Sequence, residues 1–375
     1  MARRAPRASS VPDFTSALYL GLWHASGELR PWAQLTTGTP AAVRRVPGAA
    51  AVARGLAALQ GCEAATLVPS TLHGAWDLGG IVDGQREALH VDSDVYPVLG
   101  VTALRARSRG VTVREVAHRD VAALERSVRG DARRPVVLVD GLCPGCGGPA
   151  PLGAYLAAVR RRGGLLVVDD TQAIGILGAP GGAVPEWGAG GGGSLRHHGL
   201  EHAPDILLLS SFAKALGAPV AAIAASAAVI ERFEERADTR VHSSPVSVAA
   251  VRALEHALAV NRSRGERLRH RAARAVRRFR AGLRELGIDA GGALFPVQAL
   301  PALARPAAVA LHRHLLDAGV RAVPQSWAGG AQGRSVFVLT ARSRDADIDA
   351  ALAAIAGAPQ LASLRRGRER PRVLA

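Results

Sequence analysis

Short runs of aliphatic residues recur between residues 60 and 230, and most are followed at once by Ser or Asp. Such runs are typical of strands buried on both faces of a parallel sheet. Between them lie stretches such as 150–163, whose apolar residues recur at helical spacing and predict amphipathic helices. The predicted strands are AATLVPS, EALHVDSD, VTVREVAH, PVVLVDG, GLLVVDD, DILLLSS and PVAAIAAS.

This alternation predicts an α/β fold with a mostly parallel sheet and helices on both of its faces. In sheets of this kind, ligands bind beyond the carboxyl ends of the strands. Polar residues that directly follow the predicted strands are therefore the first candidates for a functional site. The glycine-rich segment 178–200 interrupts the pattern, and its four consecutive glycines predict a loop without regular structure.

The pattern changes after residue 246. Residues 247–286 predict one long, arginine-rich amphipathic helix, and a smaller α+β part follows, with strands near ALFPVQAL and SVFVLTAR and a helix at AAVALHRHLLDAG. We therefore expect an N-terminal arm that completes the small domain, a large domain, a small C-terminal domain and a disordered basic tail. Their ranges are 1–39, 40–246, 247–364 and 365–375.

Charge and hydropathy argue against nucleic-acid binding and against a membrane span. The formal net charge of +16 would suit nucleic-acid binding, but the arginines are spread over helical segments and aromatic residues make up only 4%. We therefore expect no specific nucleic-acid partner. No signal-peptide pattern and no apolar run of about 18 residues is present, which predicts a cytoplasmic protein without a membrane span.

The three cysteines, Cys62, Cys143 and Cys146, do not suggest a disulfide framework. The CPGC sequence has the spacing of half a zinc site, but no second CxxC or HxxxH accompanies it. His197 and His198 could complete such a site only by a coincidence of folding, so no metal is expected. A redox CxxC should open a helix, whereas GGPAPL after this pair predicts a turn.

The composition singles out one side chain. Among 47 basic residues, 46 are arginines and one is Lys214. A lysine of lowered pKa can lose a proton and form an imine with a carbonyl group, which arginine cannot do. Chance survival of a single lysine would explain the same count, so the neighbouring residues must decide.

Asp169 and Asp170 follow the predicted strand GLLVV, where a carboxylate is costly unless it is paired with a cation. A structural arginine would be the ordinary partner. Together with Lys214 at the end of a later strand, the alternative is a pyridoxal phosphate site. That cofactor needs a lysine for its aldehyde and an acidic group opposite its ring nitrogen.

Four segments carry a resemblance to a known family. LLVVDDTQAIGILG resembles the LLVVDEAHSxGVLG segment of the α-oxoamine synthases, a branch of the fold-type I pyridoxal phosphate enzymes. LLLSSFAKALGAPVAAIAAS is similar to their TLSKAFGxxGGYVAGS, and VHSSPVSVAAVRAL and FVLTARSRDADID resemble further segments in the same order. The resemblance runs from about residue 35 to 355, and it implies a fold-type I enzyme with a large cofactor domain and a small C-terminal domain.

The resemblance implies roles for individual residues. Lys214 would form the Schiff base, Asp169 would face the pyridinium nitrogen, and Gln172 stands where the family has a histidine at the phenolic oxygen. A second set would contact the cofactor's phosphate. It comprises Ser210, Ser211, Ser70 and Thr71 in one subunit, and Ser243 and Ser244 reaching across a homodimer. For Ser70 and Thr71, ordinary N-capping of a helix is an equal alternative.

Three departures from the family pattern remain. The family's stacking histidine is missing, and Tyr96 in SDVYPVLG, or less favourably His73, stands in its region. Val336 occupies the place of the family's arginine for the substrate carboxylate, which leaves Arg334 as the nearby candidate. Cys143 lies where the family has a segment near the cofactor, although a plain loop is the simpler interpretation.

The resemblance implies an enzyme that joins an amino acid or amine to an acyl thioester, carried by coenzyme A or an acyl carrier protein. One alternative keeps the cofactor but makes the protein an aminotransferase or lyase. Another is a noncatalytic binding or regulatory protein that retains the fold.

Overall fold

The computed structural model of the protein describes residues 11–326 and 330–362. It divides into two compact units, a large one of Leu20–Arg267 and a small one formed by residues up to Tyr19 and from Leu268 onward. The division lies within α9 (Val248–Glu285), later in the chain than the boundary expected at residue 247. The tail at 365–375 lies outside the described residues.

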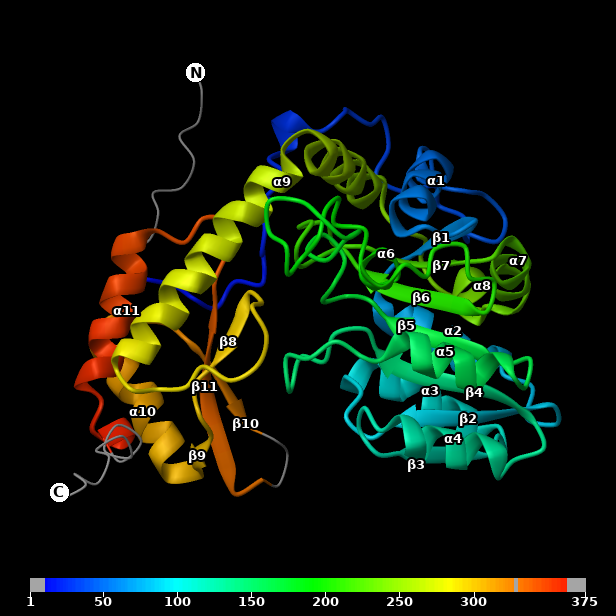
Figure 1. The fold of residues 1–375 in the computed structure, drawn as a ribbon. Coiled ribbons are helices and arrows are strands. Elements are labelled where there is room, and N and C mark those ends of the chain that lie inside the picture. Colours follow the sequence, from blue (N-terminus) through cyan, green and yellow to red (C-terminus); the bar gives the residue numbers. More distant parts are fainter. Residues whose placement is uncertain (1–10, 327–329, 363–375) are drawn as a thin grey trace. The chain divides into compact units, whose positions relative to one another are not determined.

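The large unit contains a seven-stranded sheet in the order β1-β7-β6-β5-β4-β2-β3 (Figure 1). All strands except β7 run in the same direction, because β7 is antiparallel to both of its neighbours. The fold-type I α/β prediction is confirmed, and each strand corresponds to one of the predicted aliphatic runs. The strands are β1 (Ala64–Val68), β2 (Glu87–Asp92), β3 (Val113–Val116), β4 (Arg134–Asp140), β5 (Leu165–Asp169), β6 (Ile206–Ser211) and β7 (Ala221–Ala225).

Helices cover both faces of this sheet, so successive strand residues alternate between two cores. Val167 and Leu209 pack in the core beneath α2, α3 and α7, whereas Val168 and Leu208 pack in the core beneath α4 and α5. The helices of this unit are η1 (Ser26–Glu28), α1 (Ala49–Gln60), α2 (Thr71–Ile81), α3 (Pro97–Ser108), α4 (Val121–Arg129), α5 (Leu152–Arg160), α6 (Ser194–His198), α7 (Ala227–Arg236) and α8 (Asp238–His242).

The glycine-rich segment 178–200 is mostly irregular, but it ends in the short helix α6, which the sequence did not predict. The Asp170 carboxylate accepts a hydrogen bond from the first helical N–H, that of Ser194, at 3.0 Å. This bond stabilises a helix N-terminus directly after the glycine run. Gly193 has a φ of +88°, and a Cβ there would lie 1.9 Å from Asp170 Oδ2, so any other residue would be strained and would displace this carboxylate.

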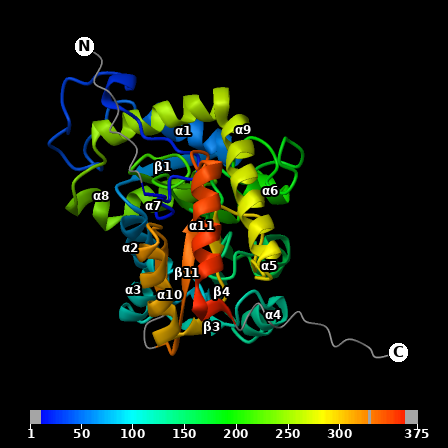
Figure 2. The ribbon, with the colours of Figure 1, turned by 90° about the vertical axis from the view of Figure 1, so that its left-hand side faces the viewer.

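The small unit contains an antiparallel sheet in the order β10-β11-β8, with β9 paired to β11. Figure 2 looks onto α10 and α11, which pack with the end of α9 against this sheet through residues such as Phe279, Leu311 and Phe337. Phe14 joins the same core, with its ring 5.6 Å from that of Phe337. The elements are β8 (Val297–Ala299), β9 (Leu303–Ala304), α10 (Arg305–Asp317), β10 (Val323–Ser326), β11 (Gln332–Val338), α11 (Asp345–Gly357) and η2 (Pro359–Leu361).

Among the described residues, no helix has both the length and the apolar character that a membrane span requires.

Candidate active site

Six of the seven strands of the large sheet end at the same edge, because only β7 runs in the opposite direction. Asp169 ends β5, between Ser211 at the end of β6 and Asp140 at the end of β4. Lys214 follows shortly after β6, and Tyr96 lies shortly after β2. The strand order thus brings the lysine, two carboxylates and the aromatic ring to the same edge of the sheet.

The alternation of side chains along the strands decides which of these groups share a face. Asp169 and Ser211 lie two residues beyond Val167 and Leu209, and so they face the side of the sheet covered by α2 and α3. Ser210 faces the opposite side, where its Oγ accepts a hydrogen bond of 2.9 Å from Gln60 Nε2 at the end of α1. The two serines predicted to bind phosphate therefore point to opposite faces of the sheet.

Lys214 lies half-buried among these groups. Burial lowers the pKa of its amine, and the nearby carboxyl groups of Asp169 and Asp140, when ionised, oppose that shift. Its Nζ atom is 5.5 Å from the centroid of the Tyr96 ring. An amine of lowered pKa is unprotonated more often at neutral pH, which is what attack on a carbonyl carbon requires.

Asp169 is only 6% exposed. Burial raises the pKa of its carboxyl group, while hydrogen bonds from Thr171 and the charge of Lys214 oppose the rise. The Thr171 N–H donates to Asp169 Oδ1 at 2.9 Å, and Thr171 Oγ1 accepts from the Ser211 N–H at 3.0 Å. These bonds fix the end of β5 against the end of β6, so the carboxyl group is held in one position.

Asp140 is a site residue that the sequence analysis did not single out. Its Oδ2 accepts a hydrogen bond of 2.9 Å from the Tyr96 N–H, and its buried Oδ1 has no hydrogen-bond partner among the described residues. Burial, reinforced by the charge of Asp169, raises the pKa of Asp140 to about 8. Its signal was present in the sequence, because Asp140 ends PVVLVD just as Asp169 ends LLVVD.

The other predicted residues of the large unit are placed as follows. Gln172 is buried, 8% exposed, in the turn after β5. Ser70 is the N-cap of α2, where its Oγ lies 2.8 Å from His73 Nδ1, and Thr71 is the first residue of that helix. Ser243 directly follows α8, where its Oγ donates to the Thr239 carbonyl oxygen, and Ser244 beside it is exposed.

Arg334 belongs to the small unit, on β11. Its Nε donates a hydrogen bond of 2.7 Å to Gln325 Oε1 on the neighbouring strand β10. Val336 is buried on the same strand. Of the two positions considered for carboxylate binding, only Arg334 carries a charge.

Comparisons with known proteins give a consistent result. Residues 103–355 match the sequence profile of the family described as aminotransferase class I and II. The 8-amino-7-oxononanoate synthase of Geobacter sulfurreducens is 32% identical over 316 residues, which cover 82% of this chain and 76% of the relative. The synthase of Methylococcus capsulatus is 34% identical over 254 residues, covering 66% of this chain and 62% of the relative.

Solved structures share the fold. The serine palmitoyltransferase of Sphingomonas wittichii superposes with a TM-score of 0.80 at 18% identity, covering 95% of this chain and 87% of that one. The 8-amino-7-oxononanoate synthase of Francisella tularensis superposes with a TM-score of 0.73 at 15% identity, covering 92% and 97%.

Proposed function

The chain belongs to the class I and II aminotransferase family, in its α-oxoamine synthase-like branch, and we propose that it joins an amino acid to an acyl thioester with pyridoxal phosphate as cofactor. One observation carries the proposal. The only lysine of the chain, with its amine pKa lowered by burial, lies beside the buried carboxyl group of Asp169 and the ring of Tyr96.

The residues at this edge of the sheet fit the cofactor. Lys214 offers the amine for its aldehyde, Asp169 offers a carboxylate for its ring nitrogen, and Tyr96 offers a flat apolar face. Ser211, on the same face as Asp169, and the N-terminus of α2 at Ser70 offer donors for a phosphate group. When bound, pyridoxal phosphate supplies an electron sink that stabilises negative charge at the α-carbon of an amino acid.

The protein's own groups control the protons of the reaction. Lys214 would hold the cofactor through its aldehyde and, as a free amine, would remove or return the proton at the α-carbon of the substrate. Asp169, held by Thr171, stays in place to keep a proton on the ring nitrogen. Asp140, with a pKa of about 8, carries a proton at neutral pH, so that two carboxylate charges do not repel each other there.

Three further roles complete the proposal. Gln172 donates a hydrogen bond to the phenolic oxygen of the cofactor and does not titrate. Arg334 binds the carboxylate of the amino acid substrate. Ser243 and Ser244 contact the cofactor phosphate of a second subunit, which makes the functional form a homodimer. The acyl donor is a thioester of coenzyme A or of an acyl carrier protein.

The test is to supply acyl-CoA thioesters and a panel of amino acids, and to measure free thiol and released carbon dioxide. We expect thiol to appear only when both substrates are present, and to be lost in Lys214→Ala. Lys214→Arg is the matched variant, since it keeps the positive charge but cannot form an imine. Formation of a 2-oxo acid without thiol release would identify an aminotransferase instead. Absence of cofactor binding would favour a noncatalytic protein.

A further inference from the structure

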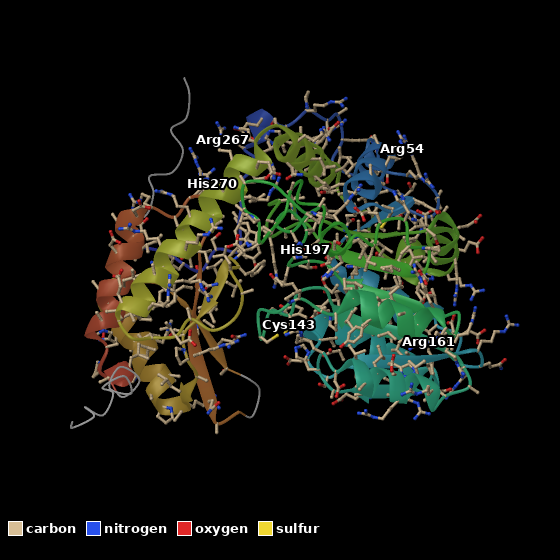
Figure 3. All side chains as sticks on the ribbon, viewed as in Figure 1. Arg54, Cys143, Arg161, His197, Arg267 and His270 are labelled. Atoms are coloured by element: carbon tan, nitrogen blue, oxygen red, sulfur yellow. The ribbon has the colours of Figure 1, made fainter. Side chains whose placement is uncertain are left out.

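A second cluster of reactive side chains lies at the same edge of the large sheet, on the two loops that follow β3 and β4. Cys143 and Cys146 come from the loop after β4, and Figure 3 labels Cys143 there. His118 comes from the loop after β3. The ligand atoms of these three residues all lie within 4.8 Å of one another, and no other group of three such residues occurs in the described part of the chain.

We propose that this cluster binds one zinc ion, with Cys143 Sγ, Cys146 Sγ and His118 Nε2 as ligands and the Asp94 carboxylate as the fourth. The proposal goes beyond the proposed function, since nothing in the reaction requires a metal.

Two of the ligand–ligand distances agree with a tetrahedral site. A zinc ion with Zn–S of about 2.3 Å and Zn–N or Zn–O of about 2.0–2.2 Å holds a sulfur and a nitrogen or oxygen ligand about 3.5–3.7 Å apart. His118 Nε2 lies 3.4 Å from Cys146 Sγ, and Asp94 Oδ2 lies 3.7 Å from Cys143 Sγ. His118, Cys143 and Cys146 therefore already lie close enough to share one ion, and only the Asp94 side chain has to turn inward to reach it.

The surroundings of His118 support the same conclusion. Its Nδ1 lies 2.7 Å from Asp92 Oδ1, which leaves Nε2 directed at the cysteines. Asp92 is itself held, because its Oδ2 accepts from the Arg119 N–H and its Oδ1 accepts from the Asp94 N–H, both at 3.0 Å. A carboxylate that holds the second nitrogen of a ligating histidine is a recurrent feature of zinc sites.

Charge and ligand type favour zinc over other divalent ions. Two thiolates and an imidazole select zinc, whereas magnesium and calcium prefer oxygen ligands. Two thiolates and one carboxylate around a divalent ion leave a net charge of −1, and the Arg119 guanidinium, 3.8 Å from Cys146 Sγ, offsets it. With four protein ligands the site is closed, which is typical of structural zinc.

The ion would connect the segment that carries Tyr96 to the loop that follows Asp140. These two segments already meet at the hydrogen bond from the Tyr96 N–H to Asp140 Oδ2. A zinc ion bound to Asp94 and Cys143 adds a second connection close by. We infer that the metal holds Tyr96 in place beside Lys214 and takes no part in the chemistry.

The test is to measure zinc in the full-length protein purified under reducing conditions, and then to titrate Zn²⁺ against a chromophoric chelator. We expect about one zinc per chain in the wild type and a loss of nearly all of it in the double variant C143S/C146S. C62S is the matched control, since Cys62 is a half-buried cysteine outside the cluster, and it should keep the metal. Replacing zinc with Co²⁺ should give the thiolate charge-transfer bands of a tetrahedral site.

A milder variant keeps the test valid if C143S/C146S does not fold. D92N removes the charge that orients His118 but leaves all four proposed ligands in the chain, and it should weaken zinc binding about 10–100-fold. Equal zinc affinity in the wild type, D92N and C143S/C146S would overturn the proposal, as would a Cys143–Cys146 disulfide in protein that takes up no zinc. Lys214→Ala should bind zinc as the wild type does, so failure of the metal site and failure of the proposed function can be told apart.

Discussion

The variant Asp140→Asn tests whether the buried carboxyl group of Asp140 is held in its protonated form. Asparagine has nearly the shape of the protonated acid and can still accept the hydrogen bond from the Tyr96 N–H. It cannot ionise. The variant therefore isolates the free energy of ionising this one group in cofactor-free protein.

The direction of the pH dependence follows from the raised pKa of Asp140. The pKa of Asp140 rises from its usual 3.8 to about 8, because burial and the charge of Asp169 disfavour the ionised form. Folded wild type thus binds this proton more tightly than unfolded chain does. The stability that Asp140 contributes is complete below about pH 4 and is lost as the pH rises to about 8. The variant has no such loss.

The loss of stability has an upper limit of about 6 kcal/mol, because the pKa of Asp140 moves from 3.8 to about 8 and each pH unit between them is worth about 1.4 kcal/mol. Local opening and water entry relieve part of this cost. We therefore expect the stability of Asp140→Asn relative to wild type to increase by about 1–3 kcal/mol between pH 4 and pH 8.

The assay is urea unfolding of cofactor-free protein at several pH values, with Asp317→Asn on α10 as the control for loss of an exposed carboxyl group. The informative quantity is the difference in the free energy of unfolding between variant and wild type, because other groups titrate over the same pH range. A difference that stays constant from pH 4 to pH 9 would show that Asp140 is ionised in the folded protein, and the reasoning would be wrong.

Two further predictions concern packing and the cofactor. Gly193→Ala should lower the free energy of unfolding by more than about 1 kcal/mol, because the added Cβ would meet Asp170 at a positive φ. Gly153→Ala is the control, because its added Cβ in α5 meets nothing within 4 Å, and it should leave stability unchanged or slightly higher. If urea unfolding showed the same loss of stability in both variants, this account would be contradicted. Tyr96→Phe should bind pyridoxal phosphate nearly as the wild type does, whereas Tyr96→Ala should bind it at least about 5-fold more weakly in a fluorescence titration. Equal affinity in Tyr96→Ala would exclude the stacking role.

The sequence predicted the large sheet well because its strands are buried on both faces and so appear as aliphatic runs. Asp169 and Lys214 could be found for the same reason, since each follows such a run. The sequence DILLLSS also shows that Ser210 and Ser211 face opposite sides of the sheet, because adjacent side chains of a strand alternate between its faces.

Other features depend on the order of strands in space. His118 meets Cys146 because the loops after β3 and β4 lie at the same edge, with β2 between the two strands. Counting CxxC and HxxxH spacings along the chain cannot reveal a histidine supplied by a different loop. The helix α6 was missed for a similar reason, since its N-terminus is stabilised by the side chain of Asp170, which is distant in sequence.

The most direct measurement is to reduce the protein with borohydride after incubation with pyridoxal phosphate, and to map the modified peptide by mass spectrometry. The account predicts one pyridoxyl group per chain, on the peptide that contains Lys214, together with loss of the absorbance of the bound cofactor. A protein that takes up no cofactor, or that carries the label only at its N-terminal amine, would contradict the central claim.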